Sequence, residues 1–190
     1  MALKLDISKA YDRVEWGFLR EVMIKMDFDE RWVGLIMKCV QTVKYAIVVN
    51  EKPGNSFVPS RGLRQGDPLS PYLFLLCAEG LSTLINKAER RGELKGVAVA
   101  KGGIRVTHLL FADDCLVFGQ ASWQEWLMIK DLLHIYERAS GQCLNRQETS
   151  LFFSSNTKED IRRRIREDVG VGIQSSCERY LGLPVMVGRS

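Results

Sequence analysis

The sequence has few of the residues that build metal–thiolate centres. Its 190 residues include two histidines and five cysteines, and no cysteine pair has the C-x-x-C spacing. A structural zinc site needs clustered cysteine or histidine ligands, so no zinc is expected. Cysteines scattered through apolar sequence are typical of reduced, mostly buried thiols, which indicates an intracellular, reducing compartment.

Long apolar runs are also missing. No stretch of about 18 apolar residues is present, so no membrane span is expected. Asp6 lies where a secretory signal would have an apolar run, which argues against export. Hydrophobic residues make up 46% of the chain and charged residues 26%, enough for a folded core, and the net charge of +4 permits a polyanionic partner without requiring one.

The spacing of apolar residues indicates a mixture of helices and strands. Helices are predicted over 16–26, 30–42, 71–90, 123–139 and 158–169. Strands are predicted over 2–7, 97–100, 104–111, 115–118, 149–153 and 179–183, with a hairpin formed by 45–50 and 57–58 around a turn at 51–55. Because no strict strand–helix–strand rhythm is present, the pattern favours the α+β class.

Three carboxylates stand out by their placement. Asp6 interrupts an apolar strand, and Asp113 and Asp114 lie side by side between two apolar segments, where a hairpin tip is expected. Two carboxylates 4 Å apart repel by about 4 kcal/mol at an effective dielectric of 20, and a divalent cation between them would relieve that repulsion. The alternative is that these residues form hydrogen bonds within turns, where aspartate is common.

The segment 61–71, RGLRQGDPLSP, combines two glycines, two arginines, a glutamine and a proline-stiffened helix entry. Such a loop can present backbone N–H groups and an arginine to an anionic or base-bearing ligand. Spacing alone leaves open that it is an ordinary loop leading into a helix.

Three strings decide between these readings. LDISKAYD (5–12), QGDPLSPYLF (65–74) and FADD (111–114) resemble motifs A, B and C of reverse transcriptases, in the same order and with similar separation. The closest resemblance is to the LINE-type, non-LTR retrotransposons common in plant genomes. YLGLP (180–184) resembles the motif that follows in those proteins, so the resemblance covers essentially the whole chain.

The resemblance implies a role for each matching position. Asp6, Asp113 and Asp114 match the catalytic aspartates that bind Mg²⁺ or Mn²⁺, and the backbone carbonyl of Ile7 matches a further metal ligand. Tyr11 matches the steric gate that stands against the sugar 2′ position and disfavours ribonucleotides.

The other matching positions concern the nucleotide and the primer. Gln65 and Gly66 match the region that contacts the nucleotide and the template strand. Tyr180, Leu181 and Gly182 belong to the segment that matches the primer grip.

The implied fold is the palm subdomain of a right-hand polymerase, an α+β structure with an antiparallel sheet backed by helices. The implied reaction is attack of a DNA primer 3′-hydroxyl on the α-phosphate of a dNTP, directed by an RNA template. In such phosphoryl transfers, catalysis is mostly positioning and charge neutralisation.

Two departures from the family pattern lead to an alternative. The chain is expected to be a single partial domain over 1–190, with palm motifs A to E and without fingers and thumb. Glu148 stands where the family commonly has a lysine that is proposed to protonate pyrophosphate. The alternative function is therefore an inactive retroelement remnant that keeps the fold and has at most weak nucleic-acid binding. The sequence does not determine an oligomeric state.

Two further features are interpreted as structural. The arginines at 162–164 and 166 could form a nucleic-acid face, but the mixed charges of 158–168 favour an ordinary amphipathic surface helix. His108 precedes the carboxylate pair, and a packed, hydrogen-bonded histidine is expected there.

Overall fold

The computed structural model describes residues 1–99, 103–111, 114–145 and 148–170, together with the backbone of 179–180 and 183–184. Its centre is a sheet of four strands in the order β10-β1-β8-β7, in which every neighbouring pair is antiparallel. The strands are β1 (Ala2–Leu5), β7 (His108–Phe111), β8 (Asp114–Phe118) and β10 (Ser150–Phe152).

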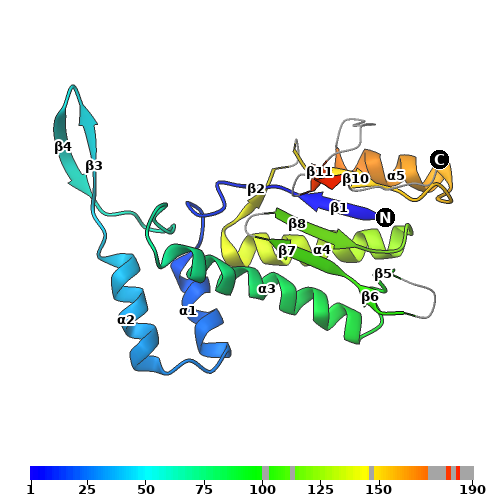
Figure 1. The fold of residues 1–190 in the computed structure, drawn as a ribbon, viewed down its shortest axis with the longest axis horizontal. Coiled ribbons are helices and arrows are strands. Elements are labelled where there is room, and N and C mark those ends of the chain that lie inside the picture. The colour runs from blue at the N-terminus through cyan, green and yellow to red at the C-terminus, as the bar shows by residue number, and fades with distance from the viewer. Residues whose placement is uncertain (100–102, 112–113, 146–147, 171–178, 181–182, 185–190) are drawn as a thin grey trace.

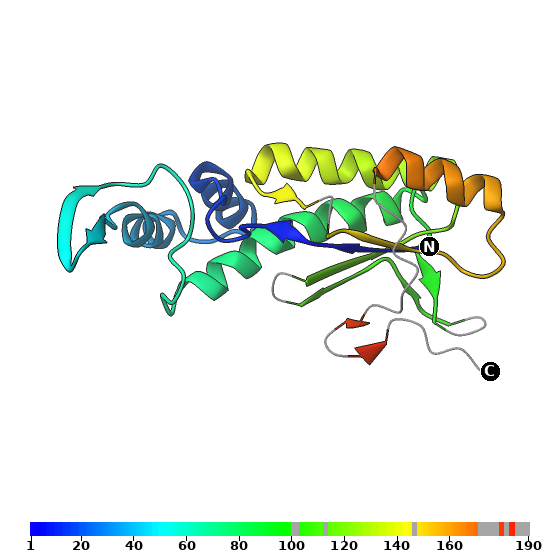
Figure 2. The ribbon, with the colours of Figure 1, turned by 90° about the horizontal axis from the view of Figure 1, so that it is seen from above.

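Three helices pack on one face of this sheet. They are α3 (Ser70–Arg90), α4 (Trp123–Ser140) and α5 (Glu159–Val169), and Figure 2 shows α4 and α5 together on one side. The sheet therefore has one face covered by helices, and the α+β prediction of an antiparallel sheet backed by helices is confirmed.

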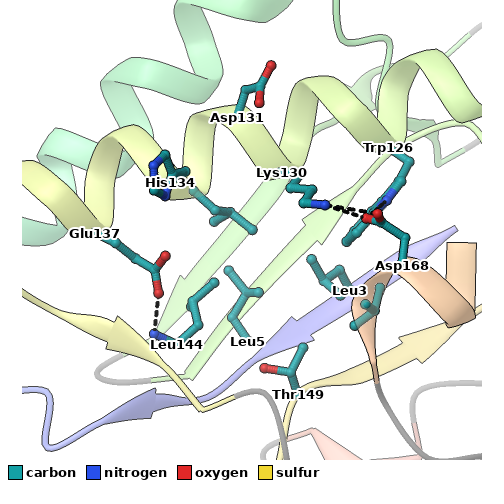
Figure 3. A pocket seen from close by; sticks show the side chains of 12 residues that line it. Leu3, Leu5, Trp126, Lys130, Asp131, His134, Glu137, Leu144, Thr149 and Asp168 are labelled. Carbon is teal, nitrogen blue, oxygen red and sulfur yellow. Dashed lines mark hydrogen bonds and ion pairs between the residues drawn. The ribbon is translucent and has the colours of Figure 1, made fainter.

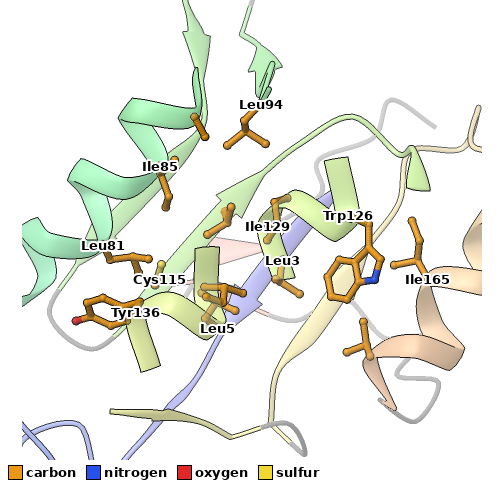
Figure 4. Packing of buried hydrophobic residues seen from close by; sticks show 14 residues of the cluster. Leu3, Leu5, Leu81, Ile85, Leu94, Cys115, Trp126, Ile129, Tyr136 and Ile165 are labelled. Atoms are coloured by element: carbon orange, nitrogen blue, oxygen red, sulfur yellow. The ribbon is translucent and has the colours of Figure 1, made fainter. Parts of the chain in front are cut away.

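Alternation along the strands determines which side chains reach the helices. Leu3 and Leu5 of β1 and Cys115 and Val117 of β8 are buried, and they join residues of α3, α4 and α5 in one apolar cluster (Figure 4). Because successive strand residues point to opposite faces, the residues between them point to the face without helices.

A second region, which we call the arm (residues 16–57), extends away from the sheet (Figure 1). It contains α1 (Trp16–Lys25), α2 (Glu30–Gln41), β3 (Tyr45–Val49) and β4 (Lys52–Phe57). Its helices have their own buried cluster with the first half of α3, whereas the second half of α3 packs in the sheet cluster. The helix α3 thus packs in both clusters and connects the two regions.

The ends of α4 follow local sequence signals. The Ser122 side chain accepts a hydrogen bond from the Glu125 N–H and caps the first turn. At the other end Gly141 adopts φ = 75°, the left-handed conformation expected of a C-terminal glycine. These two signals explain why the predicted helix over 123–139 agrees closely with the structure.

Short strand pairs complete the fold. They are β2 (Ile7–Ser8) with β9 (Cys143–Leu144), β5 (Val97–Ala98) with β6 (Arg105–Val106), and β11 (Arg179–Tyr180) with β12 (Leu183–Pro184). Figure 2 shows the β11–β12 pair on the side of the sheet opposite the helices.

Four predicted boundaries were wrong. The strand predicted over 104–111 is two strands, β6 and β7, because the chain changes partner from β5 to β8 at Thr107. The turn of the β3–β4 hairpin is Asn50–Glu51, not 51–55, because both residues adopt positive φ (48° and 64°), as a two-residue type I′ turn requires. The strand predicted over 2–7 is interrupted at Asp6, where the chain changes partner from β8 to β9. The strand predicted over 179–183 is a hairpin, β11–β12.

Candidate active site

The strand register brings Asp6 and Asp114 together. In the antiparallel β1–β8 pair, Ala2 lies opposite Phe118 and Leu5 lies opposite Cys115. Continued by one residue beyond the paired strands, the same register would place Asp6 opposite Asp114, the first residue of β8. Directly opposite residues of an antiparallel pair have Cβ atoms about 4.5–5.5 Å apart, so the two carboxylates share one small area of the sheet.

This area lies on the face of the sheet without helices. Leu5 and Cys115 point into the helix-covered core, so their neighbours Asp6 and Asp114 point the other way. Both are half-buried, and neither carboxylate forms a hydrogen bond or ion pair with any residue that the structure describes. Two unpaired carboxylates held opposite one another repel, which is a suitable arrangement for a bound cation.

The backbone around Ile7 leaves its carbonyl outside the β2–β9 ladder. The Asn145 N–H donates to the Asp6 carbonyl at 2.8 Å, whereas the Leu144 N–H, opposite Ile7, donates to the Glu137 carboxylate at 2.7 Å. Hydrogen-bonded and non-hydrogen-bonded pairs alternate along an antiparallel ladder, so the Ile7 carbonyl points away from β9.

Asp113 lies outside the described residues. Among the residues that are described, no three His, Cys, Asp or Glu side chains are close enough to hold a metal ion. The candidate donors are nevertheless hard oxygens, namely the Asp6 and Asp114 carboxylates and the Ile7 carbonyl. Such donors fit Mg²⁺ or Mn²⁺ and do not fit zinc in a thiolate site.

The loop that carries Tyr11 is joined to the loop that carries Gln65 and Gly66. The Leu63 N–H donates to the Tyr11 carbonyl at 2.8 Å, and the Tyr11 ring stacks on Phe74 of α3 with the ring centroids 4.7 Å apart. Gln65 and Gly66 are exposed. The structure thus brings the loop after β2 against the loop before α3, although the two are more than 50 residues apart in sequence.

A hollow of about 500 Å³ opens beside these loops. Its polar lining comes from Asp12, Arg61, Arg64 and Gln65, and its aromatic lining comes from β3 and β4. The size and the two arginines suit an anionic ligand that carries a base. The sequence analysis noted both arginines but did not select them as site residues; their place in a glycine-containing loop was the available signal.

The remaining predicted site residues lie near the C-terminus. Tyr180 pairs with Leu183 in the β11–β12 hairpin, and Leu181 and Gly182 lie outside the described residues. The hairpin lies on the face of the sheet without helices (Figure 2), the face toward which strand alternation directs the Asp6 and Asp114 side chains.

A cavity of about 360 Å³ lies on the opposite, helix-covered side, between α4, α5 and β1 (Figure 3). Asp168 accepts hydrogen bonds from Trp126 and from Lys130, and Glu137 accepts from the Leu144 N–H. Several of its polar groups are thus hydrogen-bonded, and none of the predicted site residues that the structure describes lines it.

Three of the four arginines of α5 contact other parts of the protein, as expected of an amphipathic surface helix. Arg164 lies over the Trp123 ring, 3.9 Å from its centroid, and Arg166 lies over Phe153. Arg162 donates to the carbonyl of Ser154. Since these guanidinium groups are engaged by the protein itself, the structure favours the packing interpretation over a nucleic-acid face.

His108 is a packed, hydrogen-bonded residue, as predicted. Its ring nitrogens lie 3.0 Å from the Ser82 hydroxyl and 3.1 Å from the Thr107 hydroxyl, and burial lowers its pKa. Burial also raises the pKa of the thiols of Cys77 and Cys115 to about 12, so these cysteines are unreactive core residues.

The comparison with known families agrees with this geometry. A family model for reverse transcriptases (RNA-dependent DNA polymerases) matches residues 1–185. The chain therefore belongs to the reverse transcriptase family.

Related proteins narrow the class to the non-LTR retrotransposons. The Pol polyprotein of the type-1 retrotransposable element R2 from Popillia japonica is 31% identical over 115 residues, which are 60% of this chain and 18% of the polyprotein. An uncharacterized 149 kDa protein of transposon TX1 from Xenopus laevis is 25% identical over 181 residues, which are 95% of this chain and 13% of that protein. The chain is a reverse transcriptase domain of the non-LTR type, and it spans a small part of these two relatives.

A third relative is matched over most of its own length. An uncharacterized mitochondrial protein of Arabidopsis thaliana is 40% identical over 111 residues, which are 56% of this chain and 86% of that protein.

Solved structures share the fold. Telomerase from Candida albicans, in complex with a TWJ fragment of telomeric RNA, superposes with a TM-score of 0.61 at 12% identity and covers 83% of this chain and 27% of that one. Apo telomerase from Candida tropicalis gives a TM-score of 0.57 at 15% identity, over 82% of this chain and 31% of that one. Within the described part of the chain, no helix has the length and apolar character needed to cross a membrane.

Proposed function

We propose that this chain is the palm of an RNA-directed DNA polymerase encoded by a LINE-type retrotransposon, with Asp6, Asp113 and Asp114 as its catalytic residues. The observation that carries the proposal is the β1–β8 register, which sets Asp6 opposite Asp114 on the face of the sheet without helices. Structural aspartates in turns are normally hydrogen-bonded, whereas these two have no partner among the described residues.

The protein's part in the reaction is to hold acidic and carbonyl oxygens at one place. Asp6, Asp114 and the Ile7 carbonyl would hold Mg²⁺ or Mn²⁺ together with Asp113. When bound, the metal supplies charge neutralisation at the attacking and leaving oxygens of the phosphoryl transfer. The strand ladder keeps the two carboxylates in fixed positions, which lowers the reorganisation needed during the reaction.

Three further residues would select and place the nucleotide. Tyr11 would stand against the sugar 2′ position as a steric gate, and its stacking on Phe74 supports this role because the ring cannot swing freely. Gln65 and Gly66 would contact the nucleotide and the template strand, and the adjoining hollow with its arginines offers space and positive charge for them.

The template would be RNA and the primer DNA. The R2 relatives and the telomerase bound to telomeric RNA support this choice. The β11–β12 hairpin, with Tyr180, Leu181 and Gly182, would form the primer grip, and its position on the carboxylate side of the sheet supports that assignment.

Metal binding tests the proposal most directly. Mn²⁺ or Mg²⁺ should raise the melting temperature of the purified chain, because an ion that binds only the folded state stabilises it. Asp114→Asn should reduce this rise to near zero, whereas Asp131→Asn, an exposed aspartate of α4, should leave it intact. A metal-induced rise that is equal in both variants would refute the site.

Primer extension then separates the polymerase from the inactive remnant. The assay uses a DNA primer on an RNA template, the four dNTPs and Mg²⁺ or Mn²⁺. Extension that disappears in Asp114→Asn supports the polymerase. Metal-dependent stabilisation without any extension would identify a remnant that keeps the site but has lost the reaction.

A further inference from the structure

Gln142 is a buried polar residue outside the strings that match motifs A, B and C. It follows the C-terminal glycine of α4 and is 1% exposed. Its Nε2 donates to the carbonyl of Ala10 at 2.7 Å, and its Oε1 accepts a hydrogen bond from the Tyr136 hydroxyl. Burial raises the pKa of Tyr136, which keeps the hydroxyl protonated and able to donate. Both ends of the amide are therefore satisfied, and its orientation is defined.

The acceptor, Ala10, immediately precedes Tyr11. The loop that carries both residues connects β2 to α1 and contains no regular secondary structure of its own. Its conformation therefore depends on the groups that hold it from outside. Gln142 is 132 positions away in the sequence and holds this loop from the α4 side.

The same loop is held at further points. The Glu15 N–H donates to the Ser140 carbonyl at 2.8 Å, next to Gln142, and the Gly62 N–H donates to the Val14 carbonyl at 2.8 Å from the other side. A Cβ at Gly141 would lie 2.6 Å from a carbonyl oxygen of this loop. The loop is thus clamped tightly between the end of α4 and the segment 61–63.

These hydrogen bonds hold different parts of the loop between β2 and α1. The bonds from Ser140 and Gly62 reach the end of the loop, close to the first turn of α1. Gln142 reaches its middle, one residue before Tyr11. On the other side of Tyr11, its ring rests on Phe74 and its carbonyl accepts from Leu63.

We infer that Gln142 is a positioning residue for Tyr11: the Gln142–Ala10 hydrogen bond sets the backbone of the sugar-facing residue and so controls discrimination between deoxyribonucleotides and ribonucleotides. The inference rests on the proposed function, because Tyr11 acts as a steric gate only if the chain binds nucleotides. A gate excludes a 2′-hydroxyl by contact, so a small displacement of its backbone is enough to admit one.

Gln142→Met tests the inference because methionine has a similar length and lacks the amide donor. Tyr136→Phe removes one bond to Gln142 but keeps the bond to Ala10, so it should have a smaller effect and serves if the first variant fails to fold. Ser82→Ala is the matched control, since Ser82 is also buried and hydrogen-bonded but contacts His108 instead of the loop.

The first measurement is hydrogen exchange by mass spectrometry. Gln142→Met should increase exchange in peptides covering 9–15 and 61–66 by about 2- to 10-fold, as expected for the loss of one hydrogen bond. Exchange of the sheet strands should stay unchanged, and Ser82→Ala should leave both loop peptides at the wild-type rate. Unchanged exchange of the loops in Gln142→Met would overturn the inference whatever the chain's activity.

The second measurement is the ratio of affinities for dCTP and CTP with Mn²⁺, which differ only by the 2′-hydroxyl. In Gln142→Met the preference for dCTP should fall by about 10-fold, through tighter binding of CTP, which a merely destabilising change would not produce. A preserved ratio with increased loop exchange also overturns the inference. Wild-type protein that binds neither nucleotide overturns the proposed function itself, so the two failures are distinguishable.

Discussion

The central sheet and the β3–β4 hairpin of the arm differ in how far their apolar side chains are buried. In the sheet, Leu3 and Leu5 are 2% and 0% exposed beneath three helices, whereas in the β3–β4 hairpin of the arm Ile47, Val48 and Val49 are 66%, 64% and 63% exposed. Burial of apolar surface is the main source of folding free energy. The comparison indicates that apolar burial in the sheet region stabilises the fold, whereas the apolar side chains of the hairpin stay exposed and stabilise it little.

The proposed site lies where the two regions meet. Asp6 ends the buried strand β1, while the loop with Tyr11 leads into the arm and is held by the segment 61–63 that returns from it. The carboxylates therefore depend on the sheet, and the nucleotide-selecting loop depends on both regions. Each of the following changes tests one part of this division.

The largest effect is expected in the core of the sheet region. Leu5→Ala should lower the free energy of unfolding by about 2–5 kcal/mol, because it removes a fully buried side chain and leaves a cavity. Leu35→Ala in α2 of the arm is the matched control: Leu35 is 56% exposed, so the change should cost no more than about 0.5 kcal/mol. Urea denaturation measures both. Similar losses would contradict the division into a stabilising and a surface region.

The next effect concerns the junction between the regions. Gly62 has φ = 94°, and a Cβ there would lie 2.7 Å from the Asp12 carbonyl oxygen; Gly66 has φ = 80° with nothing within 4 Å. Gly66→Ala should cost about 1–2 kcal/mol for the left-handed conformation. Gly62→Ala should cost about 1–3 kcal/mol more, because the clash displaces the loop. Thermal or urea unfolding measures both losses of unfolding free energy. Equal losses would mean that the loop at Gly62 adjusts to the added methyl group without strain.

A smaller change, this time an increase in the free energy of unfolding, is expected at the carboxylates. Asp6→Asn should raise the stability of the metal-free chain by about 0.2–1 kcal/mol, because it removes repulsion across the β1–β8 pair. Asp12→Asn, at an exposed position in the following loop, serves as the control and should change little. A lower free energy of unfolding of metal-free Asp6→Asn would indicate that the Asp6 carboxylate forms a structural hydrogen bond and is not a free metal ligand.

The smallest effect is a pH dependence in the sheet region. Burial lowers the pKa of His108 below 6.5, against the opposing influence of Glu79 and Glu89. The unfolded chain then binds more protons below pH 6.5, so stability should fall as the pH drops from about 7.5 to 5.5. His108→Gln should show a flatter profile by thermal unfolding over the same range. Parallel profiles for the two proteins would exclude this linkage.

Much of the secondary structure was predictable because its signals are local. The helix over 123–139 has a serine before it and a glycine after it, and both perform the expected capping roles. The turn at Asn50–Glu51 was missed because Pro53 and Gly54, the stronger turn formers, instead lie within β4. That outcome depends on the pairing of two strands, which local propensity does not describe.

The candidate site was predictable in part for the same reason. The strand-ending Asp6 and the acidic pair at 113–114 are visible in the sequence, and the reverse transcriptase resemblance relates them to one another. The role of Gln142 was not visible, because an isolated glutamine after a helix carries no signal of burial. Its polar atoms are satisfied by groups on other elements, which only the folded chain supplies.

The sequence by itself determined the family, the helices with their caps and the residues available for chemistry, because each depends on short strings of neighbouring residues. Only the tertiary structure decided that Asp6 lies opposite Asp114 and that the loop with Tyr11 is clamped between α4 and the segment 61–63. Register and long-range hydrogen bonds depend on which faces are buried together, and burial is a property of the whole packed chain.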